Sequence, residues 1–179
     1  MLAARLKKIL ESKTLVSPEA DGSVTLREQD VMDVSVLQIP ERAATVNLQH
    51  IGDFSGVKNG RWKQRCDYMF ALDQVDGSEV VFVELKKSLD TGKEKAMEQL
   101  RRSPPVLMYL KSLCQLEEQC TDEGVELRLR YFVISERYGE RLDKQRVRPN
   151  RRPETEQFKS IQVGIVVGGP LTFASLFSG

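Results

Sequence analysis

Two apolar segments separated by a short turn sequence constrain the fold of this chain more than any other feature. Residues 66–73, CDYMFALD, and residues 79–86, EVVFVELK, are both rich in aliphatic and aromatic side chains. The sequence QVDG at residues 74–77 has the length and the turn-forming residues of a β-hairpin connection. The pattern therefore predicts two adjacent antiparallel strands that are buried along most of their length.

Periodicity elsewhere predicts helices and further strands around this hairpin. Residues 2–12 have the apolar spacing of an amphipathic helix. A helix through KAMEQLRR is expected to begin at a capping box formed by Thr91 and Glu94, and a second helix to restart at Ser103 and bury an apolar side that includes Leu116. The order of elements predicts an α/β protein, with helices packed on a central mixed sheet, in a single domain over residues 1–179. The remaining strands are predicted at residues 23–28, 34–39, 44–51, 126–135 and, as the last strand, 161–169.

Charge and composition exclude several classes of site. With 27 basic and 26 acidic residues the net charge is +1, so a nucleic-acid surface would have to be a local patch. His50 is the only histidine, which excludes multi-histidine metal sites. Because it has no clear acid partner nearby in the sequence, we expect a structural role for this side chain. The three cysteines form no CxxC motif and predict reduced thiols. We find no secretory signal and no apolar stretch long enough to span a bilayer, so we expect a cytoplasmic protein with no membrane partner.

The end of the second hairpin strand carries the residues of a candidate site. Residues i and i+2 of a strand point to the same face, so Glu84 and Lys86 should lie side by side with Leu85 turned away. Antiparallel pairing would bring Asp67 to the same end of the sheet as Glu84. Carboxylates and the Leu85 carbonyl are oxygen ligands suited to Mg²⁺ or Mn²⁺, and a lysine can orient an attacking water and offset negative charge. These residues predict a phosphodiester-cleaving site that needs no histidine.

This arrangement resembles the motif of the PD-(D/E)XK nuclease superfamily, in which Asp67 would be followed by Glu84-x-Lys86 and then by a helix. The resemblance covers roughly residues 60–135, and the N-terminal helix can be added to it. It implies a restriction-endonuclease-like αβββαβ core, a metal ion bound by Asp67 and Glu84, and Lys86 assisting the nucleophilic water. Some branches carry a glutamine on the following helix, and Gln99 in KAMEQLRR matches it, which implies a supporting catalytic role.

The chain also departs from that motif. Cys66 stands where the name of the motif has proline, and Ser103 stands where one branch has a tyrosine. Many members add an acid from the first helix. Here Glu11, Glu41 and Asp53 remain alternatives for that third acid.

A basic segment, residues 141–152, is the expected contact surface for nucleic acid. It contains one acid, Asp143. Such a cluster can bind phosphates, and a solvated charged loop is an equally good interpretation of the same residues. Together with the cleavage site it leads us to expect a nucleic-acid partner, with DNA ahead of RNA. The residues predicted to make this contact are Lys144, Arg146, Arg148, Arg151 and Arg152.

Three functions remain open at this level. The first is a metal-dependent endo- or exonuclease, which could act as a homodimer or with a protein partner. The second is a catalytically inactive nuclease fold that binds nucleic acid or a protein within a larger assembly. The third is an α/β interaction domain in which Glu84 and Lys86 form a surface ion pair worth about 0.2–1 kcal/mol. A third acid beside Asp67 and Glu84 would favour the first function over the second.

Overall fold

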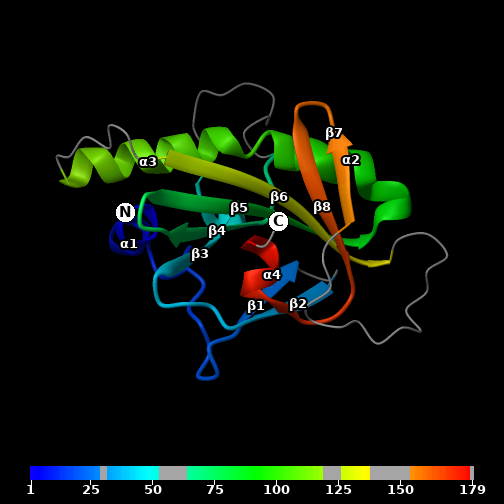
Figure 1. Cartoon of the computed structure of the whole chain (residues 1–179), viewed down its shortest axis with the longest axis horizontal. Coiled ribbons are helices and arrows are strands. Elements are labelled where there is room, and N and C mark those ends of the chain that lie inside the picture. The colour runs from blue at the N-terminus through cyan, green and yellow to red at the C-terminus, as the bar shows by residue number, and fades with distance from the viewer. Residues whose placement is uncertain (29–31, 53–63, 119–125, 138–153, 178–179) are drawn as a thin grey trace.

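The computed structural model describes residues 1–28, 32–52, 64–118, 126–137 and 154–177. Figure 1 shows a central six-stranded sheet with three helices on one face, and a three-stranded sheet with a short helix on the other. Each face of the central sheet has its own cluster of buried apolar side chains. The prediction of a mixed α/β protein is confirmed.

The strands of the larger sheet are, in chain order, β3 (Ala43–Asn47), β4 (Tyr68–Asp73), β5 (Gly77–Ser88), β6 (Glu126–Arg137), β7 (Glu154–Phe158) and β8 (Ile161–Val167). They lie side by side in the order β3-β4-β5-β6-β8-β7. The pairs β3–β4, β4–β5 and β8–β7 are antiparallel, whereas β5–β6 and β6–β8 are parallel. A parallel pair such as β5–β6 needs a crossover connection, which the helices after β5 provide.

The predicted hairpin is confirmed by the pairing of β4 with β5. The register runs from Asp73 opposite Ser78 at the turn to Tyr68 opposite Val83 at the far end. All six residues of β4 are buried, as are residues 78–85 of β5. This burial explains why both segments read as nearly continuous apolar runs in the sequence.

The helical layer consists of α1 (Leu2–Ile9), α2 (Leu89–Arg101) and α3 (Pro104–Glu118). The carboxylate of Asp73 accepts hydrogen bonds from the backbone N–H groups of Ala3 and Ala4, at 3.0 and 3.1 Å, and so caps α1 from a distant strand. Helices of the described ranges are all too short or too polar to cross a membrane.

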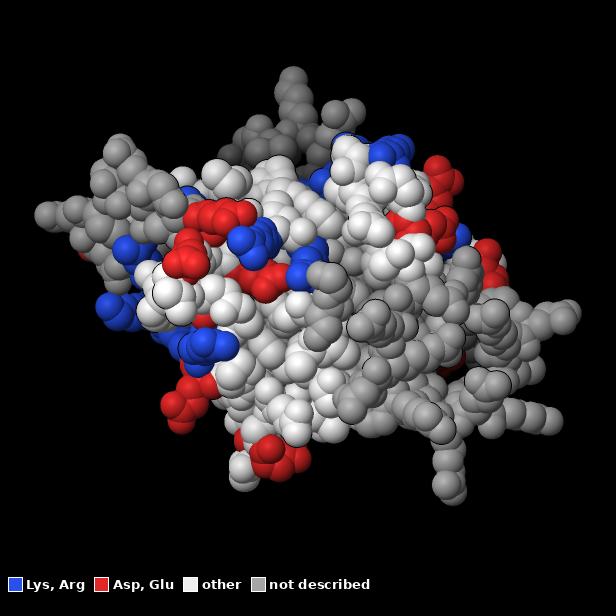
Figure 2. Space-filling view, in the orientation of Figure 1, with Lys and Arg blue, Asp and Glu red and all other residues white. Residues whose placement is uncertain are grey.

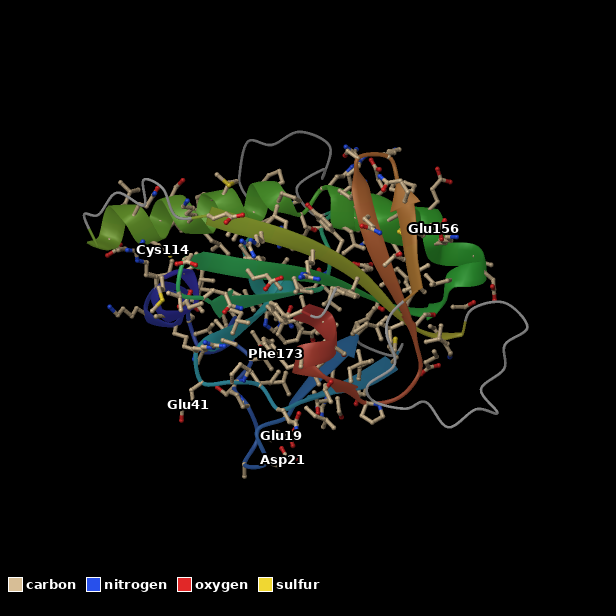
Figure 3. All side chains as sticks on the ribbon, viewed as in Figure 1. Glu19, Asp21, Glu41, Cys114, Glu156 and Phe173 are labelled. Carbon is tan, nitrogen blue, oxygen red and sulfur yellow. The ribbon has the colours of Figure 1, made fainter. Side chains whose placement is uncertain are left out.

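The second sheet contains β1 (Val24–Glu28), β2 (Met32–Leu37) and β9 (Leu171–Thr172), and α4 (Phe173–Phe177) follows directly. Strand β2 pairs antiparallel with β1 and parallel with β9. The ring of Phe173 lies edge-on to Phe70 of β4, with centroids 5.7 Å apart, between the two sheets (Figure 3). The Tyr68 hydroxyl donates to the carbonyl of Arg27 and accepts from its N–H, at 2.8 and 2.9 Å. These contacts tie the end of β1 to the beginning of β4.

Several predicted details are wrong, each for a local reason. Helix α2 begins at Leu89 rather than at a capping box, because the Ser88 hydroxyl already accepts a hydrogen bond from the backbone N–H of Asp90. Leu116 is 75% exposed because it lies two residues after the buried Cys114, and so on the opposite side of α3 from the apolar cluster. The strand at Ile161–Val167 is not the last, because β9 follows it.

Candidate functional site

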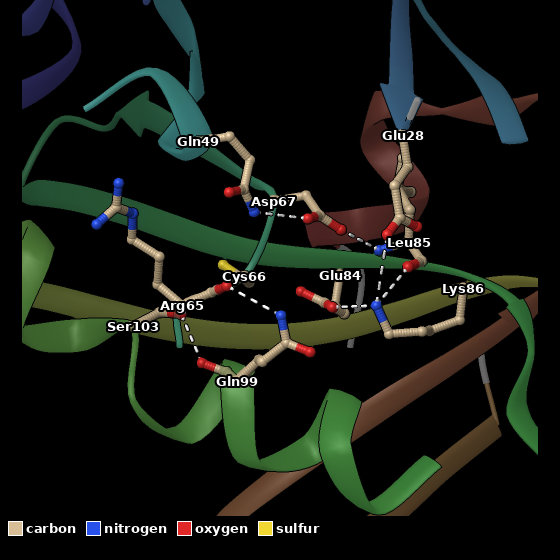
Figure 4. A network of polar contacts seen from close by, with 10 residues as sticks. All are labelled: Glu28, Gln49, Arg65, Cys66, Asp67, Glu84, Leu85, Lys86, Gln99 and Ser103. Carbon is tan, nitrogen blue, oxygen red and sulfur yellow. Dashed lines mark hydrogen bonds and ion pairs between the residues drawn. The ribbon is translucent and has the colours of Figure 1, made fainter. Parts of the chain in front are cut away.

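The β4–β5 hairpin brings Asp67 and Glu84 together at one end of the central sheet. Asp67 immediately precedes β4, one step beyond the pairing of Tyr68 with Val83, and its Oδ2 accepts a 2.8 Å hydrogen bond from the backbone N–H of Leu85. Figure 4 shows the Asp67 carboxylate directed at the end of β5. The hairpin geometry therefore places these two acids as the sequence analysis expected.

Glu84 is completely buried and lies against Lys86. Its Oε1 accepts a hydrogen bond from the Lys86 ammonium, which also donates to the Leu85 carbonyl at 2.9 Å. The Glu84 side chain is 0% exposed and that of Lys86 is 16% exposed. The interpretation of this pair as a surface ion pair is therefore wrong, because β5 is still covered by its neighbours where the pair occurs.

A short 3-10 helix, η1 (Leu48–His50), holds the other side of Asp67. It stands where the sequence predicted the continuation of a strand, and the Asn47 side chain caps it by accepting from the N–H of Gln49. The Leu48 N–H donates to the Asp67 carbonyl at 2.8 Å, and Gln49 Nε2 donates to Asp67 Oδ1 at 2.9 Å. Both carboxylate oxygens of Asp67 thus have a protein donor, and Gln49 is a site residue that the sequence analysis missed.

Gln99 reaches the same region from α2. Its Nε2 donates to the backbone carbonyl of Arg65 at 3.2 Å, while its Oε1 is buried with no hydrogen-bond partner in the described structure. Ser103 supports this arrangement, since its hydroxyl accepts from the N–H of Cys66 and donates to the carbonyl of Gln99. Ser103, which lies between α2 and α3, is therefore hydrogen-bonded directly to Cys66, the residue before Asp67.

A third carboxyl group enters the site from the second sheet. Glu28, the last residue of β1, has its Oε1 3.8 Å from the Lys86 nitrogen, and its Oε2 is buried with no partner among the described residues. Figure 4 shows Glu28 approaching Lys86 from the side opposite to Gln99. The sequence contained a signal for this residue, because SVTLRE is another alternating strand that ends on an acid. Nothing in the sequence indicated which end of the sheet that strand would meet.

The acids that were considered for this position lie elsewhere. Glu11 is exposed and forms a 2.7 Å ion pair with Lys13. Glu41 precedes β3, whose first residue pairs with Leu72, so it lies at the end of the sheet away from Asp67 (Figure 3). Asp53 lies outside the described residues.

The electrostatics of the site follow from three carboxyl groups close to one ammonium group. Burial raises the pKa of Glu84 well above its ordinary value, and the negative charge of Asp67 adds to this effect. Burial likewise raises the pKa of Asp67 and that of Glu28. For Lys86, burial acts to lower the pKa, but the carboxylates, Glu84 foremost, raise it overall. Burial thus favours the neutral forms of these acids, and a further cation would favour their charged forms.

The donor set matches the chemistry of Mg²⁺ or Mn²⁺. Glu84 Oε2, Glu28 Oε2 and Gln99 Oε1 are buried oxygens that have no partner within the described part of the chain, and oxygen is the ligand that these cations prefer. Across the described residues, no group of three or more His, Cys, Asp or Glu side chains is arranged to hold a metal ion. The oxygens of the right kind are thus present, while the Lys86 ammonium occupies the position between two of the acids.

The predicted nucleic-acid contacts cannot be placed, since Lys144, Arg146, Arg148, Arg151 and Arg152 all lie outside the described residues. Within the described part, Figure 2 shows basic and acidic side chains intermingled over the visible face. His50 is exposed, and its Nδ1 contacts the Lys13 carbonyl, which fits the structural role expected for it.

Comparisons with family models, curated proteins and solved structures produced no match for this chain. The class of protein must therefore be inferred from the site: a buried, acid-rich polar cluster with one lysine, at the end of an antiparallel hairpin.

Proposed function

We propose that this chain is a metal-dependent nuclease that hydrolyses phosphodiester bonds, with DNA as the preferred substrate over RNA. The observation that carries the proposal is the fully buried Glu84, held beside Asp67 and in contact with Lys86. An ion pair that serves stability alone does not require burial of three acids around one base, because desolvation costs several kcal/mol for each buried ion, on the order of what pairing returns. Such an arrangement is more typical of a functional site.

Each residue has a distinct role in this proposal. Asp67, Glu84 and the Leu85 carbonyl would hold Mg²⁺ or Mn²⁺, and the bound cation would supply charge stabilisation at the phosphoryl oxygens and activate water. The Lys86 ammonium can hold the oxygen of an attacking water through a hydrogen bond and offset negative charge as it develops. Gln99, anchored to Arg65 through Nε2, would support the site with its free Oε1.

The order of elements around the site supports the proposal. Helix α1, strands β3, β4 and β5, helix α2 and strand β6 occur in the order α, βββ, α and β, with β1 and β2 inserted between α1 and β3 and with α3 inserted between α2 and β6. We propose that they form the restriction-endonuclease-like core of a PD-(D/E)XK nuclease, with the second sheet as an addition. In this proposal Lys144, Arg146, Arg148, Arg151 and Arg152 contact nucleic acid, and the enzyme works in the cytoplasm as a homodimer or with a protein partner.

One observation favours the alternative of a catalytically inactive nuclease fold that binds nucleic acid or a protein. Both oxygens of Asp67 already accept hydrogen bonds from Gln49 and Leu85, and Lys86 is bound to Glu84. Because these protein donors already satisfy oxygens of Asp67 and Glu84, the two carboxylates have less need of a metal ion. The two functions differ in whether divalent cations produce cleavage.

The test is cleavage of single- and double-stranded DNA and RNA with Mn²⁺ or Mg²⁺. Wild type is compared with Glu84→Gln and Lys86→Ala, and with Lys87→Ala as a control that removes an exposed lysine next to the site. We expect each site variant to lose on the order of 100-fold or more in rate, as removal of a charge-stabilising group typically does, and the control to keep its activity. Equal cleavage by wild type and Glu84→Gln would refute the proposal. Nucleic-acid binding without cleavage by folded wild type would favour the inactive module.

A further inference from the structure

Three basic side chains share one acid where the turn between β7 and β8 meets α2 (Figure 1). Glu98 accepts two hydrogen bonds from Arg101, at 2.6 and 3.0 Å, and one from Arg102 at 3.0 Å. It also accepts one from Lys159, in the turn, at 3.0 Å. We call Arg101, Arg102 and Lys159 the basic cluster. Its three positive charges against the single negative charge of Glu98 leave a net charge of +2.

The basic cluster has donors to spare and is open to solvent. Two guanidinium groups and one ammonium group carry many more N–H donors than the two oxygens of one carboxylate can accept. The side chains of Arg101, Arg102 and Lys159 are 36%, 32% and 56% exposed. A phosphate group offers several oxygens together with negative charge, and arginine is especially suited to bind it. The cluster therefore fits a phosphate group that approaches from solvent.

The packing of the β7–β8 hairpin on α2 does not explain Lys159. Phe158 packs against the apolar cluster of the helical face, and Glu156 forms a 2.6 Å ion pair with Lys93 of α2. Exposed ion pairs such as that of Lys159 with Glu98 contribute little to stability. Lys159 also has a φ of 50°, in the left-handed region where hairpin turns favour glycine. A lysine at this position is therefore better explained by what its side chain can bind.

The basic cluster adjoins the candidate site along α2. Gln99, which directly follows Glu98, reaches the site, and Arg102 lies three positions after Gln99. Residues three positions apart are neighbours on a helix surface. The other acids of α2, Asp90 and Glu94, lie toward its beginning, so bases outnumber acids at the end that carries Gln99. A polymer bound at the site can thus also contact the cluster.

We propose that Arg101, Arg102 and Lys159 bind a phosphate group of the nucleic-acid backbone, with Glu98 holding the three side chains in place. This inference rests on the proposed function, because it names a contact of the same substrate. It requires no metal ion, and it is separate from the basic segment at residues 141–152. Neutralising a backbone phosphate releases counterions, so the contact makes nucleic-acid binding weaken with salt.

The test measures DNA binding in EDTA, where a metal-dependent enzyme does not cleave its substrate. Fluorescence anisotropy of labelled single- and double-stranded DNA is recorded at several salt concentrations for wild type and Arg102→Gln. The matched control is Arg128→Gln, because Arg128 is also exposed and has its own acid, Glu126, at 3.0 Å. We expect Arg102→Gln to bind DNA several-fold more weakly, with the slope of log affinity against log salt reduced by about 1. The control should bind as wild type does.

A second variant, Lys159→Asn, tests the cluster from the other segment. Asparagine adopts left-handed backbone more readily than lysine, so this change removes the charge without straining the turn. We expect Lys159→Asn to have the same Tm as wild type or a higher one, and to bind DNA more weakly in the same manner as Arg102→Gln.

The outcomes separate this inference from the proposed function. Weaker, less salt-dependent binding in both cluster variants, with an unchanged control, would support the cluster even if wild type does not cleave DNA in Mn²⁺. Wild-type affinity in both cluster variants, or equal weakening in Arg128→Gln, would overturn the inference and leave the cleavage site untouched. Binding of inorganic phosphate that the cluster variants lose, with unchanged affinity for DNA, would assign the cluster to a small anion and also overturn it. Absence of DNA binding by folded wild type would overturn both this inference and DNA as the substrate.

Discussion

At residue 84 a carboxylate occupies a position where a buried strand would usually carry an aliphatic side chain. Its neighbours Val83 and Leu85 are fully buried, and so is Glu84 itself. One of its oxygens contacts Lys86 and the other has no partner in the described structure. Burying a charge with incomplete pairing costs stability, so the residue is expected to be retained for what it does rather than for the fold.

This leads to a stability prediction for Glu84. Glu84→Gln keeps the shape of the side chain and removes a buried carboxyl group beside Asp67, so we expect the variant to be more stable than wild type in EDTA at pH 7. The expected gain is roughly 0.5–2 kcal/mol, the range common for single stabilising substitutions. Urea unfolding followed by circular dichroism measures it. A variant less stable than wild type would show that the contact with Lys86 outweighs the cost of burial.

Lys86 carries a second prediction at this scale. Its ammonium group lies among the oxygens that would bind a cation, so the two positive charges compete for the same acids. We expect Lys86→Met to bind Mn²⁺ on the order of tenfold more tightly than wild type while losing cleavage. Lys87→Met, which removes an exposed charge one residue away, should change neither property. Weaker Mn²⁺ binding by Lys86→Met would contradict competition for the site.

At the scale of single elements, Asp73 ties α1 to the central sheet. Its carboxylate accepts from two N–H groups at the start of α1 and from the hydroxyl of Ser78. We expect Asp73→Ala to lower the free energy of unfolding by about 1–2 kcal/mol, the size of a lost helix cap. Asp76→Ala, in the exposed turn of the same hairpin, is the matched control. Equal stability of the two variants would show that the cap contributes nothing.

A pH-dependent contact joins α2 to the turn between β7 and β8. Glu98 accepts hydrogen bonds from Arg101, Arg102 and, at 3.0 Å, from Lys159, and these partners, Arg101 foremost, lower the pKa of Glu98 far below its ordinary value. A carboxyl with a lowered pKa in the folded state stabilises the protein above its unfolded-state pKa, and this contribution is lost as the pH falls toward the folded-state pKa.

Glu98→Gln should therefore be less stable than wild type at pH 7. Because the network is solvated, we expect a difference of only about 0.5–1 kcal/mol. The difference should shrink below pH 4.5, the ordinary value for this group, and in high salt. Thermal unfolding at several pH values and salt concentrations measures it. A difference that grows as the pH falls would contradict this account.

Elements that depend on local sequence could be predicted, whereas those that depend on distant pairing could not. The β4–β5 hairpin follows from two apolar runs and their turn, and it was sufficient to bring Asp67 beside Glu84. Strand β7 was missed because its sequence, ETEQF, is mostly polar and lacks the apolar pattern of a buried strand. Such a sequence is possible here because β7 lies at the edge of the sheet. Pairing of β2 with β9 joins Val36 to Leu171, and no local pattern reports so long a separation. The position of Glu28 was missed for the same reason, because β1 reaches the site only when the second sheet packs on the central sheet.

At the scale of the whole molecule, the site lies where two sheets meet. The central sheet supplies Glu84 and Lys86, the segment directly before β4 supplies Asp67, and the second sheet supplies Glu28 (Figure 4). Assembly of both sheets is thus required before the three carboxyl groups converge.

The most direct test of the account is the position of Mn²⁺ in crystals of the protein grown with that ion, located by its anomalous scattering. We predict a peak at bonding distance from oxygens of Asp67 and Glu84, with the Lys86 ammonium moved away from Glu84. Crystals of Glu84→Gln, grown in the same way, should lack the peak. A wild-type crystal saturated with Mn²⁺ that shows no peak between these acids would contradict the central claim that the buried cluster is a cation site.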